Sequence, residues 1–308
     1  MSYLASLNPL NLLGAMPGNV AQGLIWGLMA LGVYIPFRLL DFADLTVDGS
    51  FATGGAVTVV LILHGWSVPA ALLIAILAGL AAGLITGLLH TLLGIPPILA
   101  GILTQIALYS INLNIMGMAN LAVSVDQYPL LLSSRKITAS ILIALVLIAI
   151  VISALYWYFG TEQGSAIRAT GCNPAMSKAQ GINISVTKVI ALSLSNALVA
   201  LSGGFMAQYQ GFSDINMGRG AIVIGLAAVI IGEVIFSKLF TNFGLKLLAV
   251  SIGAVIYYFV LQIVLQLGLN TNDLKLITAL IVALFLAIPY WKGKMFRGKA
   301  KKEETHHA

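Results

Sequence analysis

The stretch PAALLIAILAGLAAGLITGLLHTLL, residues 69–93, decides the fold class of this chain. It carries no charged residue and exceeds the roughly 20 apolar residues that an α-helix needs to cross a lipid bilayer. Gly79, Gly83 and Gly87 recur at every fourth position, so they share one face of the predicted helix, and such a stripe lets a second helix approach closely. We interpret the stripe as packing within the chain, in preference to a dedicated dimer face.

The composition of all 308 residues is as apolar as this stretch suggests. Hydrophobic residues make up 59% and charged residues only 8%, with a mean hydropathy of +1.00. A soluble domain carries about 25% charged residues, so the composition excludes a soluble enzyme, a nucleic-acid-binding domain and a disordered chain. The net charge of +6 is a local feature, because six basic residues fall in the last 17 positions: Lys292, Lys294, Arg297, Lys299, Lys301 and Lys302.

The sequence therefore predicts an all-α integral membrane protein. We expect about nine transmembrane helices, with a range of eight to ten, at residues 19–37, 49–64, 69–93, 97–118, 137–159, 184–208, 219–236, 243–268 and 274–291. Residues 1–18 contain two prolines and are expected to lie at the membrane interface. This gives an N-terminal segment 1–18, a transmembrane domain 19–291 and a basic tail 292–308.

The distribution of basic residues predicts the orientation in the membrane. With a cytoplasmic C-terminus and nine crossings, the inner side carries twelve basic residues, the six of the tail with Arg38, Arg168, Lys178, Lys188, Lys238 and Lys246. The outer side carries four, which are Arg135, Lys136, Arg219 and Lys275. Cytoplasmic loops of membrane proteins are enriched in lysine and arginine, so this excess favours a cytoplasmic C-terminus.

Several kinds of chemistry have no basis in the sequence. The single cysteine, Cys172, forms no internal disulfide, and no cluster of cysteine and histidine has metal-binding spacing. The first 18 residues lack the basic start of a signal peptide. No Gly-x4-Gly-Lys-Ser/Thr phosphate loop occurs, so we expect no ATP hydrolysis and no cofactor in this chain.

Three of the ten acidic residues fall in LLDFADLTVDGSFATGG, residues 39–55. If this segment is helical, Asp41, Asp44 and Asp48 share one face, with Arg38 three residues ahead of the first. One interpretation is a hydrated inner loop in which Arg38 neutralises an aspartate. The other is a broken helix that lines a translocation path, because polar backbone within a membrane is tolerated where it faces a cavity. Gly49, Gly54 and Gly55 suit a helix break and close packing. Both interpretations stay open.

The fourth predicted span carries a second polar stripe, formed by Gln105, Ser110, Asn112 and Asn114. Gln105 and Asn112 are seven residues apart and share a helix face. Amides inside a membrane usually bond to neighbouring helices, which favours structural hydrogen bonding over a solute path. Asn196 in the sixth span has the same two interpretations.

The longest polar interruption lies between the fifth and sixth spans, at residues 160–183. It predicts a short helix at about 164–171, a break at 171–174, a second short helix and another break at Gly181, with Asn183 opening the next span. Such a compact polar pair is not needed to cross a bilayer. We interpret it as a surface for a cytosolic partner, with an interfacial loop as the alternative.

Here the sequence resembles a known family. Ile167-Arg168-Ala169-Thr170-Gly171-Cys172-Asn173-Pro174, then Gly181-Ile182-Asn183 and Ser202-Gly203-Gly204, resemble the permease subunits of ABC importers of the branched-chain amino acid and ribose type. Asp44–Ser50 is similar to a family element in the broken second helix near the pathway, with Asp48 as an extra residue. Residues 218–233 resemble the family's glycine-rich stretch, so the resemblance covers roughly residues 20–290.

The resemblance implies a cytoplasmic coupling helix between spans five and six that docks on an ATPase. The residues it assigns to coupling are Gly164, Ile167, Arg168, Ala169, Gly171, Asn173, Pro174 and Gly181. Together with the polar residues of the spans, it suggests a translocation pathway formed by Phe42, Asp44, Thr46, Asp48, Ser50, Gln105, Asn112 and Asn196.

The resemblance also implies a function and partners. The sequence is most similar to a branch whose binding proteins are of the tryptophan and tyrosine type, which suggests a small polar solute, first an aromatic or branched-chain amino acid. The implied partners are ABC ATPase subunits that bind the ATP, an extracytoplasmic binding protein or lipoprotein, and a second permease copy in a homodimer. The implied location is the bacterial plasma (inner) membrane, without nucleic acid as a partner.

Two other classes of membrane protein were considered, and each would need suitable ionisable or catalytic residues within the spans. An ion-coupled secondary transporter is the alternative function, and only the Asp41–Asp48 cluster and Glu233 could serve it. An intramembrane enzyme needs a catalytic pair, but His64 and His90 lie near opposite ends of their predicted spans.

Overall fold

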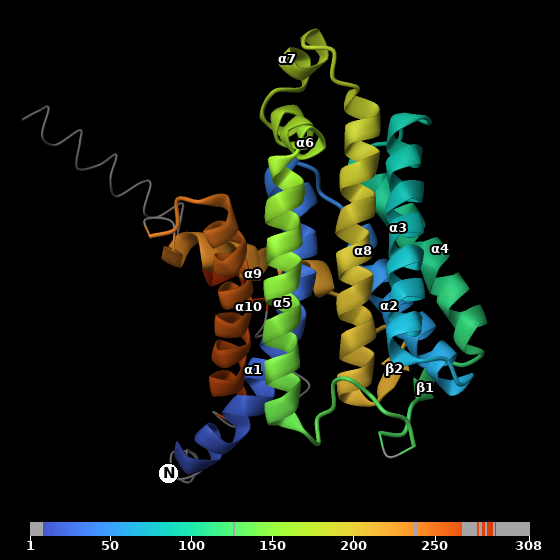
Figure 1. The fold of residues 1–308 in the computed structure, drawn as a ribbon, viewed down its shortest axis with the longest axis vertical. Helices are drawn as coiled ribbons and strands as arrows, with labels where there is room; N and C mark the ends of the chain where they lie inside the picture. Colours follow the sequence, from blue (N-terminus) through green and yellow to red (C-terminus); the bar gives the residue numbers. More distant parts are fainter. Residues whose placement is uncertain are drawn as a thin grey trace, which may run out of the picture.

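The computed structural model describes residues 9–125, 127–236 and 239–266, with scattered positions between 276 and 287 (Figure 1). The helices in chain order are α1 (Pro9–Tyr34), the π-helix η1 (Ile35–Leu39), α2 (Thr46–Leu63), α3 (Val68–Thr91), α4 (Pro97–Met116), α5 (Ile137–Gly160), α6 (Glu162–Cys172), α7 (Pro174–Ala179), α8 (Ile184–Gln210), α9 (Ala221–Phe236) and α10 (Phe243–Gln266). Two short strands, β1 (Asn120–Ala122) and β2 (Phe212–Asp214), pair antiparallel with Leu121 opposite Ser213.

The predicted all-α membrane class is confirmed. Seven helices in the described residues are long and apolar enough to cross a membrane, at Met16–Leu39, Thr46–Leu63, Val68–Thr91, Pro97–Met116, Ile137–Gly160, Ile184–Gln210 and Phe243–Val264. Each coincides with a predicted span to within a few residues. The span predicted at 219–236 is the shorter helix α9. The ninth predicted span, 274–291, and the tail lie outside the continuously described residues, so the count of nine stays a prediction.

The first helix begins earlier than the sequence suggested. The prolines at positions 9 and 17 led us to end an interfacial segment at residue 18, whereas α1 runs from Pro9 and contains Pro17. A proline in the first turn of a helix costs little, because its missing N–H would have no partner there. Helix α1 therefore extends ten residues ahead of the predicted span 19–37, and the interfacial position of residues 1–18 stays a prediction.

Helix α8 lies at the centre and packs closely against α2 and α3. A Cβ at Gly79 would overlap the Asn196 carbonyl oxygen, and one at Gly83 would overlap that of Leu192. The glycine stripe of α3 therefore serves packing within the chain, as predicted. On α2, Gly54 meets the backbone of Ala200 in the same way. The glycines of α2 thus serve close packing and not a helix break, because α2 is continuous.

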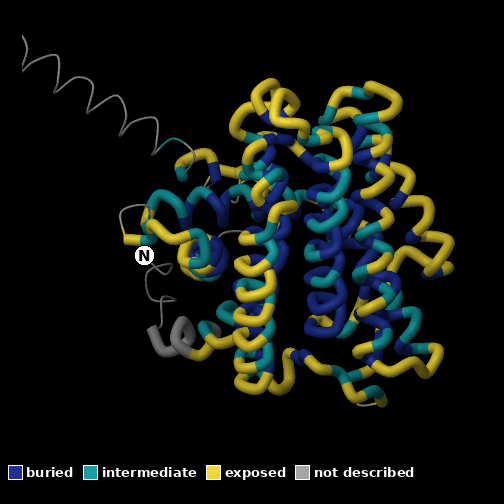
Figure 2. The backbone as a smooth tube through the Cα atoms, turned by 45° about the horizontal axis from the view of Figure 1, so that its top comes forward, coloured by how far each residue is buried: buried dark blue, intermediate teal, exposed yellow. Residues whose placement is uncertain are grey.

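The molecule is buried at its centre and apolar on its outside. Figure 2 shows buried backbone gathered in the middle of the bundle and exposed positions along the outer helices. Leu73 and Leu77 on α3 are each 61% exposed, and Leu142 on α5 is 67% exposed. Apolar surface of this extent is stable only against lipid or another protein. The outer face thus agrees with a multi-pass membrane protein.

The two ends of the bundle differ. Helices α6 and α7 project beyond one end, between α5 and α8, whereas the β1–β2 pair lies at the opposite end (Figure 1). Glycines with positive φ end two long helices at the strand side, Gly117 after α4 and Gly211 after α8.

Candidate functional site

The connection between η1 and α2 is not helical. Leu40 to Leu45 lie outside both helices, and Asp41 has a φ of 52°. Aspartate tolerates this left-handed conformation better than most residues, so Asp41 is suited to ending a helix. The condition for a common helix face of the three aspartates, a helical segment, is therefore not met. Asp41 is exposed, Asp44 is buried, and Asp48 belongs to the first turn of α2.

Arg38 pairs with a residue far along the chain and not with the neighbouring aspartates. Its Nε lies 2.8 Å from Oε1 of Glu233 on α9. The Arg38 side chain is 58% exposed, so the pair contributes at most about 1 kcal/mol. The interpretation in which Arg38 neutralises an aspartate of the cluster is wrong.

Asp44 is held by a buried amide. Its Oδ2 accepts a hydrogen bond of 2.7 Å from Nδ2 of Asn196, and its Oδ1 accepts one of 2.9 Å from the backbone N–H of Thr46. Asn196 in turn accepts a hydrogen bond of 2.6 Å from the Ser50 hydroxyl. Burial raises the pKa of the Asp44 carboxyl, and the hydrogen bonds from Thr46 and Asn196 oppose that rise. One amide thus joins α8, α2 and the preceding connection.

A ladder of threonines continues this network. The hydroxyl oxygens of Thr46 and Thr86 lie 2.7 Å apart, and the Thr86 hydroxyl lies 2.9 Å from that of Thr104 on α4. All three side chains are buried. Phe42 packs edge-on against the His90 ring, with 5.2 Å between the ring centroids. The polar residues near the start of α2 therefore connect α2, α3, α4 and α8.

Asp48 fixes the start of α9. Its two carboxylate oxygens accept hydrogen bonds of 2.9 Å each from the backbone N–H groups of Gly220 and Ile222. A carboxylate stabilises a helix N-terminus by accepting N–H groups that have no partner in the helix. Helix α9 therefore begins beside the first turn of α2. Arg219 lies there as well, in the segment just before α9, and its predicted side of the membrane stays a prediction.

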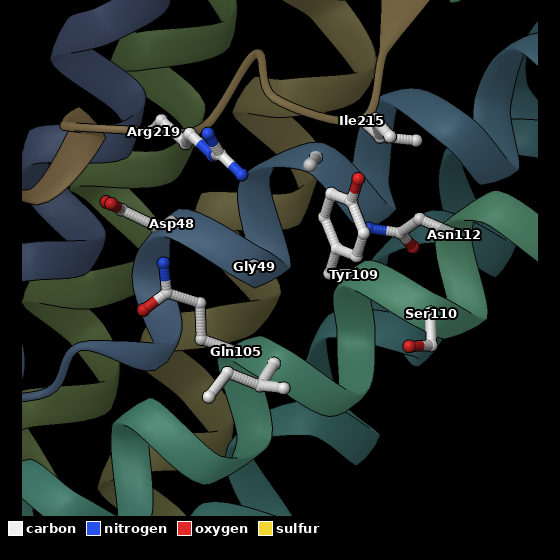
Figure 3. A pocket seen from close by; sticks show the side chains of 10 residues that line it. Asp48, Gly49, Gln105, Tyr109, Ser110, Asn112, Ile215 and Arg219 are labelled. Atoms are coloured by element: carbon white, nitrogen blue, oxygen red, sulfur yellow. The ribbon is translucent and has the colours of Figure 1, made fainter. Parts of the chain in front are cut away.

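A cavity of about 260 Å³ opens between α2, α4 and the segment before α9 (Figure 3). Polar and charged groups line it, namely Asp48, Gln105, Tyr109, Ser110, Asn112 and Arg219. Gln105 and Asn112 line the same cavity, so the prediction that they share a face of α4 is confirmed. The Asn112 side chain is fully buried, and neither its Oδ1 nor its Nδ2 has a hydrogen-bond partner among the described residues.

The segment beyond the bundle has well-capped helices. The side chains of Thr161, Asn173 and Asn183 accept hydrogen bonds from the backbone N–H groups of Gly164, Met176 and Val186, at 3.4, 3.0 and 3.2 Å. These are the N-caps of α6, α7 and α8. Gly181 adopts a φ of 83° between α7 and α8. The two predicted short helices and their breaks are confirmed as structure.

The chain matches the family model described as "Branched-chain amino acid transport system / permease component" over residues 18–288. The chain belongs to this permease family. It is similar to the tyrosine transport system permease protein of Clostridioides difficile (strain R20291), with 42% identity over 268 residues, which cover 87% of this chain and 89% of that protein. An uncharacterised protein of Rickettsia prowazekii (strain Madrid E) is 35% identical over 86% of this chain and 94% of its own length. No solved structure matches.

The residues predicted to couple the permease to an ATPase fall into two groups. Gly164 and Ile167 are buried, and Gly171 lies against the backbone of Leu39, where a Cβ would overlap the Leu39 carbonyl oxygen. The other group is exposed and consists of Ala169, Asn173, Pro174 and Gly181. One group therefore holds α6 on the bundle, and the other faces away from it.

Arg168 of the permease is directed inward. Its Nη2 donates a hydrogen bond of 2.9 Å to the carbonyl oxygen of Phe159, and its guanidinium lies 5.7 Å from the centroid of the Phe243 ring. Arg168 thus ties α6 to α5 and α10. A contact with a cytosolic partner, which we had assigned to it, stays a prediction.

The predicted pathway residues of the permease fall in two places. Phe42, Asp44, Thr46, Ser50 and Asn196 belong to the buried network. Asp48, Gln105 and Asn112 line the cavity.

Two residues of the cavity wall, Tyr109 and Arg219, were not predicted from the sequence. Tyr109 lies four residues after Gln105 and three before Asn112, so helical spacing would have placed it on their face. Arg219 stands at the edge of a predicted span, where an ionisable residue suggests a functional role.

Proposed function

We propose that this permease is the membrane subunit of an ATP-driven importer that moves an amino acid across the bacterial plasma membrane. ATP is bound and hydrolysed by separate ABC ATPase subunits, and an extracytoplasmic binding protein or lipoprotein delivers the solute. Two copies of the chain form the membrane core. The C-terminus and the α6–α7 end face the cytoplasm.

The α6–α7 pair is the observation that carries this proposal. It lies outside the bundle, and its exposed positions include Ala169, Cys172, Pro174 and Met176. Met176 is 62% exposed at the tip, which suits a contact in a groove of a partner. The N-caps Thr161 and Asn173 stabilise α6 and α7, so a bound partner can displace the two helices without unfolding them.

A short route leads from this pair to the buried network. Gly171 of α6 lies against Leu39, the last residue of η1. Five residues later comes Asp44, which Asn196 holds to α8. A displacement of α6 therefore reaches the start of α2 through backbone contact. Coupling further requires that ATPase and solute each bind two states of the permease differently.

The solute class is inferred from two observations. The 42% identical relative is described as a tyrosine transport system permease protein. The cavity beside α4 combines charged, amide and aromatic side chains, which suits a small polar solute. We propose an aromatic or branched-chain amino acid, with tyrosine first.

The native cysteine provides the test. Cys172 lies at the end of α6 and is exposed, and it is the single cysteine of the chain. In membranes that contain the ATPase, a short thiol-reactive crosslinker at Cys172 should join the permease to the ATPase, and a membrane-impermeant maleimide should label Cys172 only from the cytoplasmic side. A Cys172→Ser variant is the control for both reactions. Labelling only from the opposite side would contradict the proposed orientation and docking.

A further inference from the structure

The cavity between α2 and α4 contains two groups of opposite charge that are not joined to each other. The described residues hold one ion pair within 4 Å, that of Arg38 with Glu233. Asp48 and Arg219 line the same cavity without forming such a pair. Asp48 and Arg219 therefore give this one cavity an acidic and a basic group that do not form an ion pair with each other.

The two charged groups are held in place by different means. Asp48 accepts the two backbone N–H groups at the start of α9, which fixes its carboxylate, and each carboxylate oxygen can accept a further bond. The guanidinium of Arg219 lies 6.0 Å from the centroid of the Tyr109 ring, at cation–π distance. Figure 3 shows the Arg219 guanidinium directed toward the space over Gly49, whereas the Gln105 amide points toward Asp48.

Asn112 gives an independent indication of a ligand. Its side chain is fully buried in the cavity wall, and both polar atoms lack a partner among the described residues. A buried amide without partners is costly, and native proteins rarely keep one without a reason. Asn196, equally buried, bonds to Asp44, Ser50 and the Leu192 carbonyl. Asn112 is therefore not part of the hydrogen bonding that holds the helices together.

We propose that this cavity binds the α-amino and α-carboxylate groups of a zwitterionic amino acid within the permease itself. Asp48 and the Gln105 carbonyl accept from the ammonium group, and Arg219 and the Asn112 amide donate to the carboxylate. Tyr109 offers its ring to an apolar or aromatic side chain of the solute. The volume of about 260 Å³ lies just below the roughly 300–1,000 Å³ of ligand pockets, which suits one amino acid.

The inference deepens the proposed function, on which it rests, because it places recognition of the solute's charges in the permease and not only in the binding protein. It further predicts that neutralising either charge weakens transport without weakening the contact with the ATPase. The cavity residues belong to α2, α4 and the segment before α9, whereas the ATPase surface belongs to α6 and α7.

The test uses proteoliposomes with the full complex of permease, ATPase and binding protein, and measures ATP-dependent uptake of radiolabelled L-tyrosine and L-leucine. Arg219→Gln should lower uptake about tenfold, as expected for the loss of one hydrogen-bonded charge, and Arg219→Lys should lose less. Lys136→Gln is the matched control, because Lys136 is an exposed cation outside the cavity. Uptake and basal ATP hydrolysis should both stay at the wild-type level in Lys136→Gln.

A second variant separates binding from folding. Asn112→Leu removes a buried amide that has no partner, so it should leave thermal stability unchanged or raise it while uptake falls. A transporting wild type together with unimpaired uptake in Arg219→Gln and Asn112→Leu would overturn the proposed site and leave the importer assignment intact. A wild-type complex that hydrolyses ATP but takes up neither amino acid would overturn the proposed amino-acid function.

Discussion

At the scale of single residues, two buried asparagines have opposite surroundings. Asn196 on α8 forms three hydrogen bonds, to Ser50, Asp44 and the Leu192 carbonyl, whereas the amide of Asn112 on α4 has no partner among the described residues. The sequence gives both the same two interpretations, since each is an amide within an apolar helix. Only the positions of neighbouring helices separate the structural amide from the one that faces a cavity.

We predict that Asn196→Leu destabilises the permease by about 3 kcal/mol, because the Asp44 carboxylate and the Ser50 hydroxyl then lose a buried partner. Thermal unfolding in detergent measures this loss. Asn112→Leu is the matched control, since it makes the same substitution at an equally buried amide that has no partners. Equal stability losses in the two variants would contradict the assigned roles.

Prediction from the sequence succeeds at residues whose environment is set by neighbours in the chain. Asn173 and Pro174 were predicted to form the break between two short helices, and they are the N-cap and the first residue of α7, because capping and a proline in the first turn are local features. The pairing of Arg38 with Glu233, 195 residues later, has no local cause, so the sequence suggested a nearby aspartate instead.

At the scale of helices too, features with a local cause could be predicted, and features that depend on distant residues could not. The seven long spans follow from apolar length, which is a property of one segment. Helix α9 begins beside the first turn of α2, where Asp48 accepts hydrogen bonds from the backbone N–H groups of Gly220 and Ile222, and this long-range contact has no signal in the sequence. The cavity depends on that start, and it therefore could not be predicted from the sequence.

The contact between α6 and η1 carries an element-scale prediction. Gly171→Ala places a methyl group against the Leu39 carbonyl oxygen, and overpacking of this kind costs about 1–3 kcal/mol. We expect the loaded binding protein to stimulate ATP hydrolysis several-fold less in this variant, with basal hydrolysis retained. Gly160→Ala is the control, because nothing lies within 4 Å of a Cβ at that position. Full stimulation in Gly171→Ala would contradict a coupling route through Leu39.

At the scale of the molecule, the bundle has an apolar outside and a buried polar network, and a helix pair projects beyond one end (Figure 1). The described basic residues of the predicted inner side gather near the helix pair, where Lys188 contacts His90 and Arg168 contacts Phe243. Arg219 lies with Asp48 in the wall of the cavity, and its assignment to the outer side stays a prediction. The remaining basic residues still favour the cytoplasm at the α6–α7 end.

The central claim is that ATP hydrolysis drives transport, and uptake into proteoliposomes tests it most directly. The complex of permease, ATPase and binding protein is reconstituted with ATP enclosed in the vesicles, and radiolabelled L-tyrosine uptake is followed while ionophores abolish all ion gradients. The account predicts uptake that requires hydrolysable ATP and persists with the ionophores. Uptake that proceeds without ATP and stops when a proton or sodium gradient is removed would contradict the account and support an ion-coupled secondary transporter.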